Sequence, residues 1–313
     1  MSMRSFYWIL ACTLASVAAV PARAGGLSFT CSSDGDKRIE SCSDFKMTFW
    51  KTALGKDGIV TARRSQTLAL GAYASKPLEV GASDRGGIRV QPSTDGSFSA
   101  LVCMAAGAAS NDHAEEILDG LHVENRDGHL SVDGPDTGDW AATIVLSVPT
   151  GVTLELSATN GGLQLSEVNG HFTLRTENGP IGMTHASGVV DARTDNGPIQ
   201  FRGHAGDVRL TGQNGPVQVD LDAPRWSGKG LDASTQNGPI ALTAPDDMKS
   251  GVEVTGSRMS PATWNGTPQP IEVQGSGSRR YHFGSDEIVV RLSTERGPME
   301  IKAPKRRRAD MKI

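Results

Sequence analysis

The chain has 313 residues, a formal net charge of −4, 37 glycines and only 5% aromatic residues. An acidic, glycine-rich composition is typical of a secreted repeat protein and excludes a basic groove for nucleic acid. We expect no transmembrane segment, because no later stretch reaches eighteen apolar residues.

Residues 1–24 have the pattern of a secretory signal peptide. Arg4 precedes an apolar run over 6–20, and Ala22-Arg23-Ala24 supplies a cleavage site of small residues. We therefore expect the mature protein to begin near Gly25 and to be exported to the periplasm, the cell surface or the extracellular space. A weak lipobox match ending at Cys12 leaves lipidation as an alternative.

Residues 25–65 form a polar N-terminal segment that we expect to contain a disulfide. Without Cys12, the mature chain has Cys31, Cys42 and Cys103, so one disulfide and one free thiol are the simplest arrangement. Pairing of Cys31 with Cys42 is preferred, because their segment has little apolar material and Cys103 sits in a strand-like run where a buried thiol is ordinary. The pairing of Cys42 with Cys103 stays open.

Residues 66–152 predict irregular β-strands that lead into a repeat region. The strands are expected at 77–80, 87–90, 98–104, 121–124, 129–132 and 143–148. One short helix is predicted, with Asp112 and Glu115 as a capping box and Gly120 as its end. Such a helix would cap the open end of a repeat structure.

Residues 153–245 contain a nine-residue repeat, marked by glycines in unbroken register from Gly161 to Gly215. Positions 2 and 4 of every unit are apolar, which predicts one strand with a buried face, followed by a glycine corner with positive φ. The predicted core consists of Leu154, Leu156, Leu163, Leu165, Phe172, Leu174, Ile181, Met183, Val190, Ala192, Ile199, Phe201, Val208, Leu210, Val217 and Val219.

An eighteen-residue period is superimposed on the nine-residue one and selects the fold. The asparagines that share it are Asn160, Asn178, Asn196 and Asn214. In a parallel β-solenoid of about 18 residues per coil these side chains stack at roughly 4.8 Å and form an amide ladder. The alternative antiparallel meander places them two strands apart and gives no reason to favour one edge. We therefore predict an all-β, β-helix-like solenoid.

Residues 246–304 are predicted to form irregular C-terminal coils. The register is first interrupted by an excursion at 225–230, and Asn237-Gly238 then restores the corner. Arg296-Gly297 repeats that corner with arginine in place of asparagine. Residues 305–313 are a basic tail, interpreted as a solvated end, with weak contact to an anionic surface as the alternative.

Several short motifs resemble those of the uncharacterised bacterial β-strand-repeat proteins of the putative adhesin family. They are Gly87-Ile88-Arg89-Val90, Leu146-Ser147-Val148-Pro149, the Thr-x-Asn-Gly corners, Trp226 to Leu231, and Ser234 to Gly238. The resemblance covers roughly residues 65–303. It implies a β-helix-like fold outside the cytoplasm, with no established catalytic residues.

Outward positions also stack every eighteen residues, with Arg175 over Arg193 and Glu177 over Asp195. Such columns occur in solenoid enzymes that cleave acidic polysaccharides, but the interpretation as solvated surface pairs is the stronger one. His171, His185 and His204 occupy different repeat positions and predict no metal site. No compact catalytic motif is present, so we expect no enzyme activity and no cofactor.

Trp226 is the candidate binding aromatic, because an aromatic on a glycine-flanked excursion can stack on a sugar ring. In the alternative it folds back over the end of a coil, and Trp264 has the same two interpretations. The sequence thus predicts an exported, non-enzymatic, adhesin-like binding or structural protein of the bacterial envelope, with a glycan or protein partner. The alternatives are a polysaccharide-active lyase or hydrolase, and a self-assembling scaffold.

Overall fold

The computed structural model describes residues 11–13, 27–32, 37–51, 59–136, 139–265, 270–274, 277–285 and 287–303. The chain divides into two compact units, residues 1–182 and 183–313, which are taken in turn below. The fold is all-β, with two large mixed sheets. The signal cleavage site and the basic tail lie outside the described residues, so both stay predictions.

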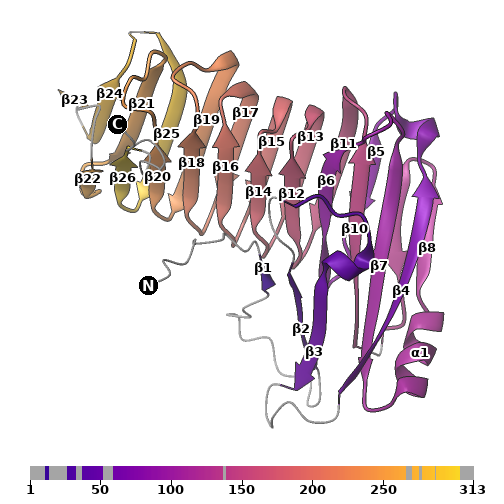
Figure 1. Cartoon of the computed structure of the whole chain (residues 1–313). Coiled ribbons are helices and arrows are strands. Elements are labelled where there is room, and N and C mark those ends of the chain that lie inside the picture. Colours follow the sequence, from indigo (N-terminus) through magenta and orange to yellow (C-terminus); the bar gives the residue numbers. More distant parts are fainter. Residues whose placement is uncertain are drawn as a thin grey trace, which may run out of the picture. The chain divides into compact units, whose positions relative to one another are not determined.

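The first unit contains five strands of one mixed sheet (Figure 1). In spatial order they are β12 (Gly162–Ser166), β6 (Gly86–Pro92), β10 (Asp139–Val148), β7 (Ser99–Ala108) and β4 (Val60–Ala69). β6 pairs in parallel with β12 and β10, whereas β7 is antiparallel to β10 and β4. Within the region predicted before the repeats, β7 and β10 therefore form an antiparallel pair, whereas β6 is already parallel to its neighbours.

Its second mixed sheet contributes strands that lead into the repeats. In order they are β8 (His122–Arg126), β9 (His129–Asp133), β5 (Leu78–Gly81), β11 (Val152–Ala158) and β13 (Asn169–Thr176). β11 and β13 are parallel, with Leu154 opposite Phe172, which is one repeat of eighteen residues. Two 3-10 turns, Cys42–Asp44 and Gly71–Tyr73, connect strands in this unit.

A separate antiparallel sheet contains β1 (Ala11–Thr13), β2 (Leu27–Ser32) and β3 (Lys46–Lys51). β1 falls within the predicted signal peptide, so a chain cleaved near Gly25 would keep only β2 and β3. The side chains that β3 contributes to the core, Met47 and Phe49, are buried, and so is Phe45 just before it.

The predicted helix exists as α1 (Asn111–Asp119), but its start was misassigned. Ser110 is the N-cap: its side-chain oxygen accepts a hydrogen bond from the backbone N–H of His113 at 3.4 Å. Asp112 lies inside the first turn, where its negative charge favours the helix N-terminus without capping it. Arg64 of β4 donates to the Asp119 side chain at 2.8 Å and ties the helix to its sheet.

The second unit contains two sets of strands. One set is β16 (Ile199–Gly203), β18 (Val217–Leu221), β20 (Ile240–Thr243), β26 (Met299–Lys302) and β22 (Ala262–Asn265). The other is β15 (Ser187–Thr194), β17 (Ala205–Gly212), β19 (Ser227–Asn237), β25 (Ile288–Arg296), β21 (Gly251–Ser257), β24 (Ser278–Phe283) and β23 (Ile271–Gln274). β14 (Ile181–Thr184) spans the boundary between the units.

Parallel pairing with an eighteen-residue offset recurs in this unit. Val190 lies opposite Val208, and Ile199 lies opposite Val217. The excursion at 225–230 is absorbed as an irregularity between β17 and β19, after which Leu231 lies opposite Val208. The strands at the C-terminal end include antiparallel pairs, because β24 reverses direction against β21 and β23.

Every predicted core residue of the repeats is buried. Leu154, Leu174, Ile199 and Val217 have no exposed area, and Phe172 and Phe201 are the largest side chains in this core. The alternation of apolar and polar positions therefore assigned the inward face of each repeat strand correctly, since side chains of a strand point to opposite faces in turn.

The role of the corner glycines differs from the prediction. Gly179 and Gly215 do not adopt positive φ; instead, a Cβ at Gly179 would lie 1.9 Å from the Gly161 carbonyl oxygen, and one at Gly215 would lie 2.2 Å from that of Gly197. Glycine is required there because consecutive corners approach too closely for a side chain. Positive φ occurs at the intervening corners, including Gly188 and, without glycine, His185.

Buried threonines add a second contact at the same corners. Thr176 Oγ1 donates to the Gly161 carbonyl at 3.3 Å, and Thr235 Oγ1 donates to that of Gly215 at 2.8 Å. The hydroxyl thereby satisfies a corner carbonyl that the strand ladder does not reach. The Thr-x-Asn-Gly motif is thus explained by an inward hydroxyl, an outward amide and a close backbone approach.

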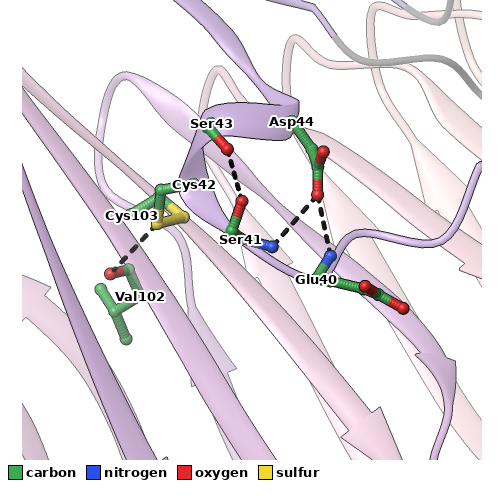
Figure 2. Close-up of a disulfide and its surroundings, with 7 residues drawn as sticks. All are labelled: Glu40, Ser41, Cys42, Ser43, Asp44, Val102 and Cys103. Atoms are coloured by element: carbon green, nitrogen blue, oxygen red, sulfur yellow. Dashed lines mark hydrogen bonds between the residues drawn. A yellow bond between two sulfur atoms is a disulfide. The ribbon is translucent and has the colours of Figure 1, made fainter.

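The disulfide joins Cys42 to Cys103, with 5.4 Å between their Cα atoms (Figure 2). The preferred pairing of Cys31 with Cys42 is therefore wrong. Cys103 faces the segment that carries Cys42, because residues 37–49 lie across the outside of β7, whereas the prediction assumed that Cys103 pointed into a core.

No helix in the described residues is long and apolar enough to cross a membrane.

Candidate functional site

Three corners of the second unit bring together a cluster of titratable side chains. His185 lies between β14 and β15, His204 lies between β16 and β17, and Asp222 directly follows β18. His185 has φ of 51°, and its backbone N–H donates to the Arg202 carbonyl at 2.7 Å. This hydrogen bond fixes a backbone conformation that a residue other than glycine adopts only at some cost.

Asp222 is shared by both imidazoles. His185 Nε2 donates to Asp222 Oδ2 at 2.7 Å, and His204 Nδ1 donates to Oδ1 at 2.6 Å. Each histidine side chain is 46% exposed, whereas that of Asp222 is 22% exposed. One carboxylate therefore connects three successive corners at the surface of the molecule.

The electrostatics of the cluster favour an ionised Asp222. Burial raises the pKa of its carboxyl, but the hydrogen bonds from His204 and His185 and the charges of the two imidazoles lower it further, so the pKa lies below its ordinary value. The carboxylate accepts a hydrogen bond from each imidazole whether that ring is neutral or protonated. Protonation of either ring adds a charge-charge attraction to the hydrogen bond.

The geometry favours a surface clamp over a metal or catalytic site. In the part of the chain that the structure describes, no group of three or more His, Cys, Asp or Glu residues is arranged to hold a metal ion. His185 Nε2 and His204 Nδ1 face the carboxylate at hydrogen-bonding distance, so these two nitrogens are not free as ligands. Among the described residues, neither imidazole bonds a hydroxyl or thiol that it could activate as a nucleophile.

The sequence contains part of the signal for this cluster. His204 and Asp222 are eighteen residues apart, so they occupy the same position of successive eighteen-residue repeats. The histidines share no column with one another, so a pattern of histidines alone does not reveal the carboxylate that His204 contacts. His185 is thirty-seven residues from Asp222, and no column of the repeat predicts that contact.

Among the predicted charged candidates, Arg193 lies at an exposed position of β15, Asp195 directly follows that strand, and Arg175 is half-buried in β13. Arg193 Nε is 3.6 Å from Asp195 Oδ1, with side chains 56% and 40% exposed. An exposed pair of this kind contributes at most about 1 kcal/mol. In the first unit, Arg175 donates to the carbonyl of Leu174 at 3.2 Å. The contact between Arg193 and Asp195 is that of a solvated surface pair, whereas the printed contact of Arg175 is with the backbone.

Trp226 is folded onto the core and is only 8% exposed. Its ring centroid is 5.9 Å from that of Phe201, and its Nε1 donates to the Gly206 carbonyl at 3.0 Å. The ring does not offer an open face for a sugar. The buried position of Trp226 agrees with the alternative interpretation, in which the excursion folds back.

A column of alternating charges lies on the outer face of the second unit. It crosses strands β15, β17, β19, β25 and β21, and it was not predicted from the sequence. Strand register places one column of charges in alternating order: Asp191, Arg209, Asp232, Arg291 and Glu253. Arg280 continues it, with its Nε 3.5 Å from Glu253 Oε2. Opposite charges in cross-strand positions attract, so this face neutralises itself along its length.

Comparison with solved structures finds bacterial proteins of low similarity. The chain is similar to a putative adhesin from Bacteroides fragilis, with 14% identity and a TM-score of 0.38 over 79% of this chain and 98% of that one. A putative adhesin from Parabacteroides merdae has 7% identity and a TM-score of 0.39 over 78% of this chain and 96% of that one. A putative lipid binding protein from Parabacteroides distasonis has 12% identity and a TM-score of 0.31 over 78% of this chain and 97% of that one.

No protein-family model matches the chain, and no curated protein matches it. The identities and TM-scores of the solved structures are low, so the functions in their names are not transferred to this chain.

Proposed function

We propose that this chain is an exported, non-enzymatic binding protein of the bacterial envelope, with an adhesin-like role. In this proposal the repeats form a parallel β-solenoid of about 18 residues per coil. The eighteen-residue parallel register within each unit supports it, as do the hydrogen bonds between stacked asparagine side chains. The pattern of the signal peptide and a disulfide between Cys42 and Cys103 support export.

The observation that carries the binding role is the alternating column on the outer face of the second unit. Arg209 lies between Asp191 and Asp232 in the register, so its charge is compensated on both sides. A compensated face does not concentrate a polyanion, because no excess of positive charge builds up. A flat surface of regularly spaced donors and acceptors suits an uncharged or zwitterionic glycan, or a protein surface, held by hydrogen bonds.

The rival enzyme would use Arg193 and Asp195 on an acidic polysaccharide. Their separation of 3.6 Å and their exposure give no low-dielectric pocket in which a base or an arginine would be activated. The surface clamp at Asp222 holds both imidazoles without a nucleophile. We therefore place catalysis second and binding first.

A glycan array with neutral, zwitterionic and acidic glycans tests the proposal. We expect binding to neutral or zwitterionic glycans that weakens several-fold in Arg209→Ala, because a central hydrogen-bond donor of the face is lost. Lys229→Ala is the matched control, since its side chain is 83% exposed and lies outside the column. Turnover of an acidic polysaccharide that disappears in Arg193→Ala would establish the enzyme instead.

A further inference from the structure

A column of hydroxyl groups lies beside the column of alternating charges on the second unit. Thr211, Ser234, Ser293 and Thr255 occupy matching positions of β17, β19, β25 and β21. Each follows a member of the charge column by two residues, so both columns lie on the same face of the sheet. Ser234 Oγ donates to the Leu210 carbonyl at 3.5 Å, and a hydroxyl of this kind can still accept through its lone pairs. This face therefore carries charges and sugar-compatible groups side by side.

Three charges at the centre of the charge column are exposed. They are Arg209, Asp232 and Arg291, and their order across the strands is positive, negative, positive. Glu253, at one end of the column, is half-buried and already pairs with Arg280. The three central charges are therefore the ones that a ligand can reach from solvent.

The spacing of these charges is set by the spacing of the strands. β17, β19 and β25 are neighbours in one sheet (Figure 1). Adjacent strands lie about 5 Å apart, so Arg209 and Arg291 are separated by two strand spacings, or about 10 Å, with Asp232 midway between them. One disaccharide unit of an extended, linear polysaccharide has a similar length. The face thus repeats its charge pattern once for each such unit.

A ligand whose charges all have one sign gains little from this order. A polymer of carboxylates is attracted by Arg209 and Arg291 but repelled by Asp232 between them, and a polymer of amines meets the reverse. A neutral glycan forms hydrogen bonds with the face but gains no charge-charge attraction. A ligand that alternates anion and cation at the spacing of the strands is attracted at every position. Charge complementarity therefore favours a zwitterionic ligand.

We propose that the ligand of this face is a linear zwitterionic glycan, with one carboxylate and one amino group in each disaccharide, that lies across β17, β19 and β25. Its carboxylates contact Arg209 and Arg291, its ammonium group contacts Asp232, and its hydroxyls contact the hydroxyl column. A polysaccharide repeats its charges at a fixed interval, whereas the surface of a folded protein does not, so the regular face favours a glycan. This inference rests on the binding function proposed above and narrows it to one class of glycan.

A comparison of oligosaccharides of equal length tests the charge requirement on the unmodified protein. N-deacetylated heparosan alternates glucuronate with glucosamine and is the zwitterionic probe. Heparosan itself keeps only the carboxylates, a chitosan oligosaccharide keeps only the amines, and a chitin oligosaccharide has neither charge. Titration calorimetry in mildly acidic buffer, where the amino sugar is protonated, measures each dissociation constant. We expect the zwitterionic probe to bind roughly tenfold more tightly than the others, because several exposed ion pairs form together.

An exchange of two charges tests whether their order matters. Arg209→Asp combined with Asp232→Arg keeps the net charge of the column but removes the alternation, and should weaken binding of the zwitterionic probe roughly tenfold. The matched control is Lys229→Asp combined with Asp207→Lys, an exposed pair 3.1 Å apart outside the column, and should leave binding unchanged. Thermal unfolding checks that both variants are folded. If the exchanged column prevents folding, Arg209→Gln removes one charge alone and should weaken binding of the same probe several-fold.

Two results would overturn the zwitterionic ligand. One is binding of a neutral or single-sign probe as tight as that of the zwitterionic probe, and the other is equal binding by the parent and the exchanged column. The proposed binding function would survive either result, because a glycan is still bound. Absence of binding to every oligosaccharide, including every glycan on the array, would overturn both proposals and would leave a protein surface as the occupant of this face.

Discussion

Asn237 donates its side-chain amide to Asn214 Oδ1 at 3.0 Å, although twenty-three residues separate them. The other neighbouring pairs, Asn178 with Asn160 and Asn214 with Asn196, are eighteen residues apart. The five extra residues of the excursion are therefore accommodated without disturbing the corner. Arg296 Nη1 donates to Asn237 Oδ1 at 3.0 Å, so arginine continues this row of amides.

Asn214→Ala should destabilise the protein by about 1 to 2 kcal/mol, because it removes hydrogen bonds to both neighbouring asparagines. Urea unfolding measures the loss. Gln213→Ala, at the exposed neighbouring position, should change the free energy of unfolding by less than about 0.5 kcal/mol. Equal losses in the two variants would show that the row of amides adds nothing.

Gly215→Ala should cost about 3 kcal/mol, because the new methyl group would lie 2.2 Å from the Gly197 carbonyl oxygen and the corners would have to separate. Gly71→Ala is the control, since nothing lies within 4 Å of a Cβ at that position and φ there is not positive. Thermal unfolding compares the two. A Gly215→Ala protein as stable as the parent would contradict the close approach.

Asp222→Asn should lower stability near neutral pH by about 1 kcal/mol, with a smaller effect in acid. The pKa of Asp222 is lower in the folded protein than its ordinary value. Such a carboxylate stabilises the fold above its unfolded pKa, and this contribution disappears as the pH falls through the folded pKa. The difference between parent and variant should therefore shrink at acidic pH.

Denaturant unfolding at several pH values checks this behaviour, with Asp220→Asn as a control for loss of a carboxylate from the adjoining strand. A difference between the parent and Asp222→Asn that is the same at every pH would exclude a role for the Asp222 charge.

Trp226→Ala should destabilise the second unit by about 3 kcal/mol, because the ring is buried against Phe201. Trp226→Phe keeps an aromatic ring but loses the hydrogen bond to Gly206, and should cost about 1 kcal/mol. Calorimetry separates the two. Loss of glycan binding in Trp226→Ala without any loss of stability would restore Trp226 as a binding residue.

Sequence periodicity predicted the features that depend only on alternation along a strand and on the length of the repeat. Leu154 and Val217 are buried because alternation along a strand decides which face is inward, and the asparagines stack because the repeat length sets their spacing. The reason why glycine is required at the corners was not predictable from a single nine-residue repeat. A Cβ at Gly179 would clash with the carbonyl oxygen of Gly161, which belongs to another corner.

Contacts outside the repeat were the least predictable. Cys103 pairs with Cys42 across sixty-one residues because residues 37–49 cover the outside of β7, and nothing in the local pattern near Cys103 indicates this cover. The convergence of His185 on Asp222 likewise depends on how far two side chains reach between corners. The N-cap at Ser110 was missed because Asp112 and Glu115 offered an equally spaced capping pair.

The alternating charges of the second unit restrict how such a chain can change length during evolution. Deleting the single repeat that carries Arg209 would bring Asp191 opposite Asp232 and place like charges side by side. Loss or duplication of two such repeats together would preserve the alternation. Repeats that carry this column should therefore be gained and lost in pairs, whatever their length, so the number of strands in the column should keep a parity imposed by electrostatics.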